Sequence, residues 1–112
     1  RVYGRSPSVA TEVERIKRCG GWVQNGRVCS ILMVSRAFGD RQFKGAGLEE
    51  LLRVGVEEKM WDAQHSAAVS FAADPIIATP DVTELNLTPE DEFIVVATDG
   101  LWDTMTSKQV VQ

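Results

Sequence analysis

The stretch FIVVATDGLWD, residues 93–103, decides the expected fold. The apolar run FIVVA has the length of a strand, and such a run predicts a central strand covered on both faces. Asp99 follows the end of this strand, where Gly100 makes a sharp turn sterically easy. If the chain turns helical after Gly100, Asp99 and Asp103 are related as i and i+4, so both carboxylates can point to one side of the strand end.

Two carboxylates in this arrangement are suited to half of a hard-cation site. Mg²⁺ and Mn²⁺ prefer octahedral oxygen coordination, and they often take one or two carboxylates with water in the remaining positions. A structural interpretation is also open, in which Asp99 caps the following turn through its side chain and Asp103 is an exposed helical residue. The spacing alone does not decide between the two.

Upstream, the pattern predicts one short helix and a hairpin. Thr11 and Glu14 have the spacing of a capping box, and Gly20-Gly21 supplies a stop, so residues 11–19 are expected to be helical. The pair Asn25-Gly26 in WVQNGRVC is a strong signal for a hairpin turn. The apolar segment SILMVS that follows is strand-like.

After residue 44, the sequence pattern is first typical of helices and then, from Ala68, typical of strands. Residues 45–65 predict two short helices, or one helix kinked at Gly55. From Ala68 onward AVSF, IIAT, VTELNL and EFIVVAT are expected to be strands, with a turn at TPED. These elements indicate a mixed α+β sheet protein and not a doubly wound one.

Composition bounds the chain to at most one domain, with 112 residues, 44% of them hydrophobic and 25% charged. The formal charge of -4 argues against nucleic-acid binding, and the basic stretch Arg15–Arg18 is interpreted as a solvated helix face. Residues 1–10 do not resemble a targeting segment, and no apolar run of about 18 residues predicts a membrane span. Because the chain opens on Arg1 and closes inside the apolar KQVVQ, we expect both ends to be cut.

The two cysteines, Cys19 and Cys29, fit neither a metal knuckle nor a disulfide-rich scaffold, which makes a reducing compartment the default. Cys29 and Arg36 raise the possibility of a cysteine-dependent phosphatase loop. That loop has five intervening residues, whereas six lie between these two, and SILMVS contains no glycine. We therefore expect Cys29 to be a small buried hydrophobic residue.

Other candidate residues have simpler interpretations. The single histidine, His65, has no carboxylate at a useful spacing and is expected at the surface or at a helix end. Arg36 and Asp40 in RAFGD are expected to form an ion pair, with a phosphate-facing arginine as the alternative. The tryptophans at positions 22, 61 and 102 are expected to serve packing.

Three stretches resemble the metal-dependent serine/threonine protein phosphatases of type 2C, the PPM family. RIKRCGGWVQNGRVCSILMVSRAFGDRQFK, Arg15–Lys44, resembles the family's Gly-Gly hairpin and its Ser-Arg-Ala-x-Gly-Asp signature. ATPDVTELNL resembles the segment before the last motif, and DEFIVVATDGLWDTMTSKQVV, Asp91–Val111, resembles the metal-binding Asp-Gly-x-x-Asp stretch. The resemblance implies a central β-sandwich flanked by helices, with a centre of two or more Mg²⁺ or Mn²⁺ ions at one end of the sheets.

The resemblance also implies roles for individual residues. Asp99 matches the aspartate that binds the catalytic metal pair, and Asp103 matches an aspartate used for a further metal ion. Arg36 and Asp40 match signature residues that are structural. The implied reaction is hydrolysis of phosphoserine or phosphothreonine in proteins by a metal-activated water.

The chain departs from the family pattern because the family's Asp-Gly-His-Gly motif, its phosphate-binding arginine and its later Asp-Asn motif are absent. Residues 1–112 are therefore expected to be a carboxy-proximal fragment of one catalytic domain, with little activity alone. Two alternatives stay open: a pseudophosphatase that binds phosphoproteins without turnover, and a metal-free α+β interaction domain in which Asp99 caps a turn.

A helical insertion at about residues 45–73, which contains GVEEKMW, is similar to plant and algal members. Within these, the likeness is to thylakoid-associated phosphatases that act on light-harvesting antenna proteins. This resemblance implies a phosphoprotein substrate and a chloroplast location, with the cytoplasm or nucleus as the alternative. We expect a monomer with no nucleic-acid partner and no membrane span.

Overall fold

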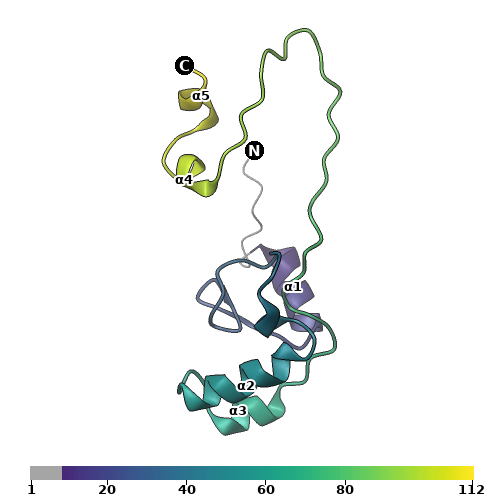
Figure 1. Ribbon diagram of the computed structural model, residues 1–112, viewed down its shortest axis with the longest axis vertical. Coiled ribbons are helices and arrows are strands. Elements are labelled where there is room, and N and C mark those ends of the chain that lie inside the picture. Colours follow the sequence, from purple (N-terminus) through teal and green to yellow (C-terminus); the bar gives the residue numbers. More distant parts are fainter. Residues whose placement is uncertain (1–8) are drawn as a thin grey trace. The chain divides into compact units, whose positions relative to one another are not determined.

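A computed structural model describes residues 9–112; residues 1–8, part of the stretch in which no targeting segment is expected, lie outside the described residues. The chain divides into two units, one that ends at Pro80 and one that comprises Asp81–Gln112. The first unit contains α1 (Ala10–Arg18), β1 (Val23–Gln24), β2 (Arg27–Val28), the 3₁₀ helix η1 (Arg41–Phe43), α2 (Gly47–Glu57) and α3 (Ala63–Ala68) (Figure 1). The second contains α4 (Asp99–Trp102) and α5 (Ser107–Val110).

Helix α1 confirms the expected helix, but it begins differently. Its N-cap is Val9, which forms no side-chain cap bond, so the predicted capping box of Thr11 and Glu14 is wrong. The C-terminal stop is confirmed, since Gly20 adopts a φ of 88° and its amide donates to the Lys17 carbonyl at 3.0 Å. A Cβ at Gly20 would lie 2.0 Å from the Ser70 carbonyl oxygen, so glycine is needed there on steric grounds as well.

The hairpin is confirmed at the expected turn. Asn25 and Gly26 both have positive φ, 51° and 70°, as a type I′ turn requires, and Val23 pairs with Val28 across the two strands. The following SILMVS is not a strand, because Cys29 and Ser30 have φ of 49° and 62° and fold the chain into a turn. There Ser30 Oγ accepts a hydrogen bond from Trp22 Nε1 and donates one to Gln24 Oε1, each at 2.9 Å.

The core of the first unit gathers buried side chains from most of its elements, but none from α3. Residues from α1, the hairpin, η1, α2 and the segment before Pro80 contribute. These are Ile16, Val28, Cys29, Phe43, Leu48, Leu51 and Ile76.

Helix α2 confirms the first of the two expected helices, whereas the second, α3, begins only at Ala63, so Met60 and Trp61 lie outside both. The two helices lie side by side (Figure 1). The break is not at Gly55, which lies inside α2, but at Lys59, whose φ is 59°. Glycine at position 55 admits the Trp61 ring, because a Cβ there would lie 1.9 Å from Trp61 Cζ2. Helix α3 is then capped by Asp62 Oδ1, which accepts the His65 amide at 2.6 Å.

The strands predicted after Ala68 are not formed. Ile77 makes an isolated parallel bridge with Arg36, and residues 81–98 contain no strand. The expected central strand is instead exposed, with 75% of Ile94 and 91% of Val96 accessible. A strand needs the amide and carbonyl groups of a neighbour, and among residues 9–112 no strand pairs with this segment. The turn at TPED is confirmed by Thr88 N, which donates to Asp91 Oδ2 at 2.8 Å.

The described residues thus form helices with a two-stranded sheet, and no sandwich is seen among them. Over residues 9–112, none of the helices has both the length and the apolar character needed to cross a bilayer.

Candidate functional site

The two predicted metal-ligand residues lie one helical turn apart, as expected. Asp99 is the first residue of α4, and Asp103 follows the last one as its C-cap. The Asp103 amide donates to the Asp99 carbonyl at 2.8 Å, and both residues are exposed. The local turn is tied to the preceding segment because Trp102 Nε1 donates to the Ala97 carbonyl at 2.9 Å.

The carboxylate of Asp99 does not act as a helix cap. The N-cap of α4 is Thr98, which forms no side-chain cap bond. Within the described part of the chain, neither Asp99 nor Asp103 makes a side-chain hydrogen bond or ion pair. Both carboxylates are therefore open to solvent and to a ligand, which disfavours the interpretation of Asp99 as a turn cap.

The donor set fits part of a divalent-metal site. Two exposed carboxylates can supply one or two oxygen ligands to Mg²⁺ or Mn²⁺, with water or other donors in the remaining positions. Among residues 9–112, no three or more histidine, cysteine, aspartate or glutamate side chains form a group that could hold an ion. Asp99 and Asp103 could therefore supply two oxygen ligands to such an ion, and the rest of the coordination stays open.

The signature loop, residues 35–40, is fixed by a charge network in the first unit. Arg36 does not pair with Asp40 as predicted; its Nη2 lies 2.8 Å from Glu12 Oε1 and its Nε lies 3.2 Å from Glu12 Oε2. Its Nη1 also donates to the Thr79 carbonyl at 3.0 Å. Asp40 has another role, as the left-handed residue before η1, with φ 48°.

Arg15 completes this network, so the prediction of a fully solvated face for the basic stretch is wrong at this residue. Its Nη2 lies 3.1 Å from Glu12 Oε2 and also donates to the carbonyls of Ser35 and Pro75, at 3.1 and 2.9 Å. Lys17 and Arg18, in contrast, are exposed as expected. Arg15 therefore connects α1 to the start of the signature loop and to the segment before Pro80.

Glu12 is a buried charged residue that the sequence pattern does not predict. Its side chain is 2% exposed, and the hydrogen bonds from Arg36, with a smaller contribution from Arg15, lower its pKa to about 2 against the opposing effect of burial. An acidic residue in the first turn of a helix ordinarily complements the helix dipole at the surface. One feature of the sequence is consistent with the burial of Glu12. It lies four residues before Ile16, which is buried, so the two side chains share one face of α1.

The geometry excludes the cysteine-dependent phosphatase loop. Cys29 is fully buried, as predicted, and burial raises the pKa of its thiol to about 11. The guanidinium of Arg36 is occupied by Glu12 and Thr79. A buried thiol that stays protonated is a poor nucleophile, and an arginine bound to Glu12 and Thr79 is not available to bind a phosphate.

Trp22 and Trp61 pack against one another, as expected. Their ring centroids lie 5.2 Å apart in an edge-to-face arrangement. His65 is exposed within α3, and its ring lies 4.6 Å from that of Trp22. These contacts join α3 to the hairpin.

Comparison with known proteins agrees with the resemblance seen in the motifs. Residues 3–112 match the family described as Protein phosphatase 2C. Protein phosphatase 2C 57 from Arabidopsis thaliana is 45% identical over 99% of this chain and 28% of its own length. Protein phosphatase 2C homolog 3 from Schizosaccharomyces pombe is 37% identical over 95% of this chain and 20% of its own length. The chain thus spans less than a third of the length of these relatives.

Proposed function

The chain belongs to the protein phosphatase 2C family, and on that premise we propose that the protein hydrolyses phosphoserine and phosphothreonine in other proteins with the help of Mg²⁺ or Mn²⁺. The observation that carries the proposal is the pair Asp99 and Asp103. These carboxylates lie one turn apart at the start and end of α4, exposed and without a protein partner among residues 9–112. We further propose that residues 1–112 form the carboxy-proximal part of one catalytic domain, and we expect this stretch alone to have little activity.

In this proposal Asp99 and Asp103 hold divalent cations by their carboxylate oxygens. Bound there, the cations would activate a water molecule and offset negative charge on the phosphoryl group. Asp99 has the larger role as a ligand of the catalytic pair, and Asp103 binds a further ion. Helix α4 sets the spacing of the two side chains through the hydrogen bond from the Asp103 amide to the Asp99 carbonyl.

Titration calorimetry with Mn²⁺ tests the ligand assignment without any turnover. The whole natural protein should bind Mn²⁺, and Asp99→Asn should weaken or abolish the tightest binding step. Asp103→Asn should leave that step in place and remove a weaker one. Asp91→Asn is a matched control, because Asp91 is exposed and serves the turn at Thr88. Equal Mn²⁺ binding by the wild type and Asp99→Asn would overturn the assignment.

A narrower proposal concerns the substrate. We propose light-harvesting antenna proteins of the chloroplast, acted on by a monomeric enzyme. The proposed substrate and its chloroplast location are supported by the likeness of the insertion at about residues 45–73 to thylakoid-associated members. Faster dephosphorylation of phosphorylated antenna protein than of an unrelated phosphoprotein, with Mn²⁺ present, would support it. Equal rates of dephosphorylation of the two proteins would contradict the proposed antenna substrate but not the proposed phosphatase activity.

A further inference from the structure

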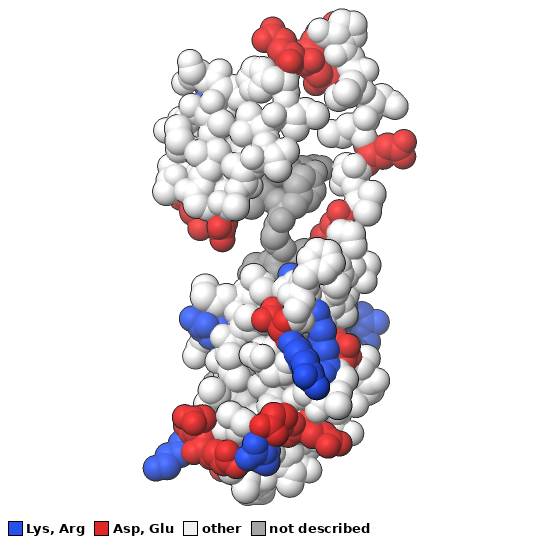
Figure 2. Space-filling model, viewed as in Figure 1, with Lys and Arg blue, Asp and Glu red and all other residues white. Residues whose placement is uncertain are grey.

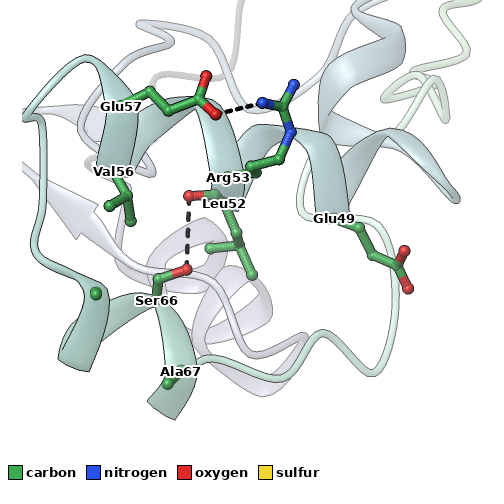
Figure 3. A pocket seen from close by; sticks show the side chains of 8 residues that line it. Glu49, Leu52, Arg53, Val56, Glu57, Ser66 and Ala67 are labelled. Atoms are coloured by element: carbon green, nitrogen blue, oxygen red, sulfur yellow. Dashed lines mark hydrogen bonds and ion pairs between the residues drawn. The ribbon is translucent and has the colours of Figure 1, made fainter.

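A groove with an apolar floor runs between α2 and α3, with a volume of about 520 Å³ (Figure 3). Leu52 and Val56 line it from α2, and Ala63 and Ala67 line it from α3. In each helix the two residues are four positions apart and so share one face. The groove exists because alanines on α3 face larger aliphatic side chains on α2 and leave space beside them.

The two walls of the groove are held in place by polar contacts. The carbonyl of Leu52 accepts hydrogen bonds from Trp61 Nε1 at 3.2 Å and from Ser66 Oγ at 3.5 Å. The Trp61 ring also packs against the backbone at Gly55, where it leaves no room for a Cβ. A groove between fixed walls is already ordered before a ligand arrives, which reduces the entropic cost of binding.

The rim of the groove is acidic. Glu49 and Glu57 flank it on α2, and Arg53 lies between them. Arg53 is occupied by ion pairs with Glu50 and Glu57, whereas Glu49 has no ion pair among the described residues. Figure 2 shows carboxylates gathered at the end of this unit where α2 and α3 lie, with fewer basic side chains among them. Carboxylates thus outnumber the guanidinium beside the apolar floor.

We propose that this groove docks a short helical segment of another protein, with aliphatic side chains one turn apart and lysine or arginine on either side. The aliphatic side chains fill the space over Leu52 and Val56, in the manner of an amphipathic helix in a groove. The basic residues lie near Glu49 and Glu57, because complementary charge favours that orientation. This docking needs no metal and no phosphate, so it stands apart from the proposed hydrolysis.

Fluorescence anisotropy of a labelled peptide tests the docking directly. The probe is Lys-Arg-Ala-Leu-Ala-Ala-Ala-Leu-Lys-Arg with a fluorescein label, titrated with the whole natural protein in the presence of a chelator. We expect saturable binding that weakens as salt rises, since exposed charges are screened. Peptides with both leucines replaced by serine, or with the basic residues replaced by glutamine, should bind at least about tenfold more weakly. Equal binding of all three peptides would contradict the proposal.

Variants of the groove then locate the binding. Ala67→Leu fills the groove from an exposed position and should weaken binding of the peptide at least about tenfold. Glu49→Lys should weaken binding of the peptide about threefold or more. Ala68→Leu, next to the groove, is the control for size. Glu14→Lys, an exposed reversal on α1, is the control for charge. Absence of saturable binding by the wild type, or unchanged binding by both groove variants, would overturn the proposal.

Discussion

Glu12 and Arg36, 24 residues apart in the sequence, form an ion pair in which Arg36 Nη2 lies 2.8 Å from Glu12 Oε1. The pair joins α1 to the signature loop, and Arg15 adds a second guanidinium to the same carboxylate. Because Glu12 is almost fully buried, the charge of its carboxylate is compensated by these arginines and not by water. These contacts therefore hold the signature loop against α1.

Removal of the Glu12 charge should destabilise the protein. Glu12→Gln keeps the shape but removes the buried negative charge that the guanidinium groups of Arg15 and Arg36 share, at a cost of about 3 kcal/mol in the free energy of unfolding. Urea unfolding of the whole natural protein measures this. Glu14→Gln, on the exposed face of the same helix, is the control and should change the free energy by less than about 0.5 kcal/mol. Equal effects of the two substitutions would contradict the buried network.

The same network predicts an acid dependence of stability. The pKa of Glu12 is lowered from 4.5 to about 2, so the folded state holds the ionised form more strongly than the unfolded state does. Its contribution, about 3 kcal/mol, is complete above pH 4.5 and is lost as the pH falls toward 2. The free energies of unfolding of the wild type and Glu12→Gln should therefore converge over this range. A difference that stays constant from pH 6 to about pH 2 would argue against the pair.

Gly55→Ala should destabilise α2, although alanine has the higher helix propensity by about 1 kcal/mol. A methyl group there would overlap the Trp61 ring, and relief of that overlap requires a shift of this ring, which packs edge-to-face against Trp22. We expect a loss of about 1–3 kcal/mol in the free energy of unfolding.

A double-mutant cycle gives the control for this prediction. In a Trp61→Leu background the obstruction is smaller, so Gly55→Ala should cost much less or stabilise the helix. A stabilising Gly55→Ala in the wild-type background would show that the ring does not occupy this position.

The buried thiol of Cys29 should be inert. With its pKa raised to about 11 and its side chain fully buried, it should react with iodoacetamide far more slowly than the half-buried Cys19. Mass spectrometry of peptides from the labelled native protein compares the two sites. Fast labelling of Cys29 at pH 7.5 would contradict the burial and reopen a role for a cysteine nucleophile.

The features that the sequence predicted well depend on local chemistry. The stop of α1 at Gly20 and the hairpin at Asn25-Gly26 follow from backbone conformations that few other residues adopt. The spacing of Asp99 and Asp103 follows from a single helical turn. In each case the determining residues are neighbours in the sequence.

The features that it predicted wrongly depend on partners far along the chain. FIVVA has the composition of a strand, but no described strand pairs with it, so its residues are exposed. Arg36 has Asp40 nearby in the sequence, yet it binds Glu12 because the fold of the first unit brings α1 against the signature loop. Gly55 does not end a helix; it lies inside α2, where the absence of a side chain leaves room for the Trp61 ring. Such contacts have no signature in spacing alone.

The central claim is tested most directly by the hydrolysis of a phosphothreonine peptide by the whole natural protein with Mn²⁺, beside its Asp99→Asn variant. We predict turnover that requires Mn²⁺ and that falls by at least about a hundredfold in the variant at matched Mn²⁺, because a ligand of the catalytic ions is lost. A folded wild-type protein with no Mn²⁺-dependent turnover would contradict the claim and favour a pseudophosphatase that binds phosphoproteins.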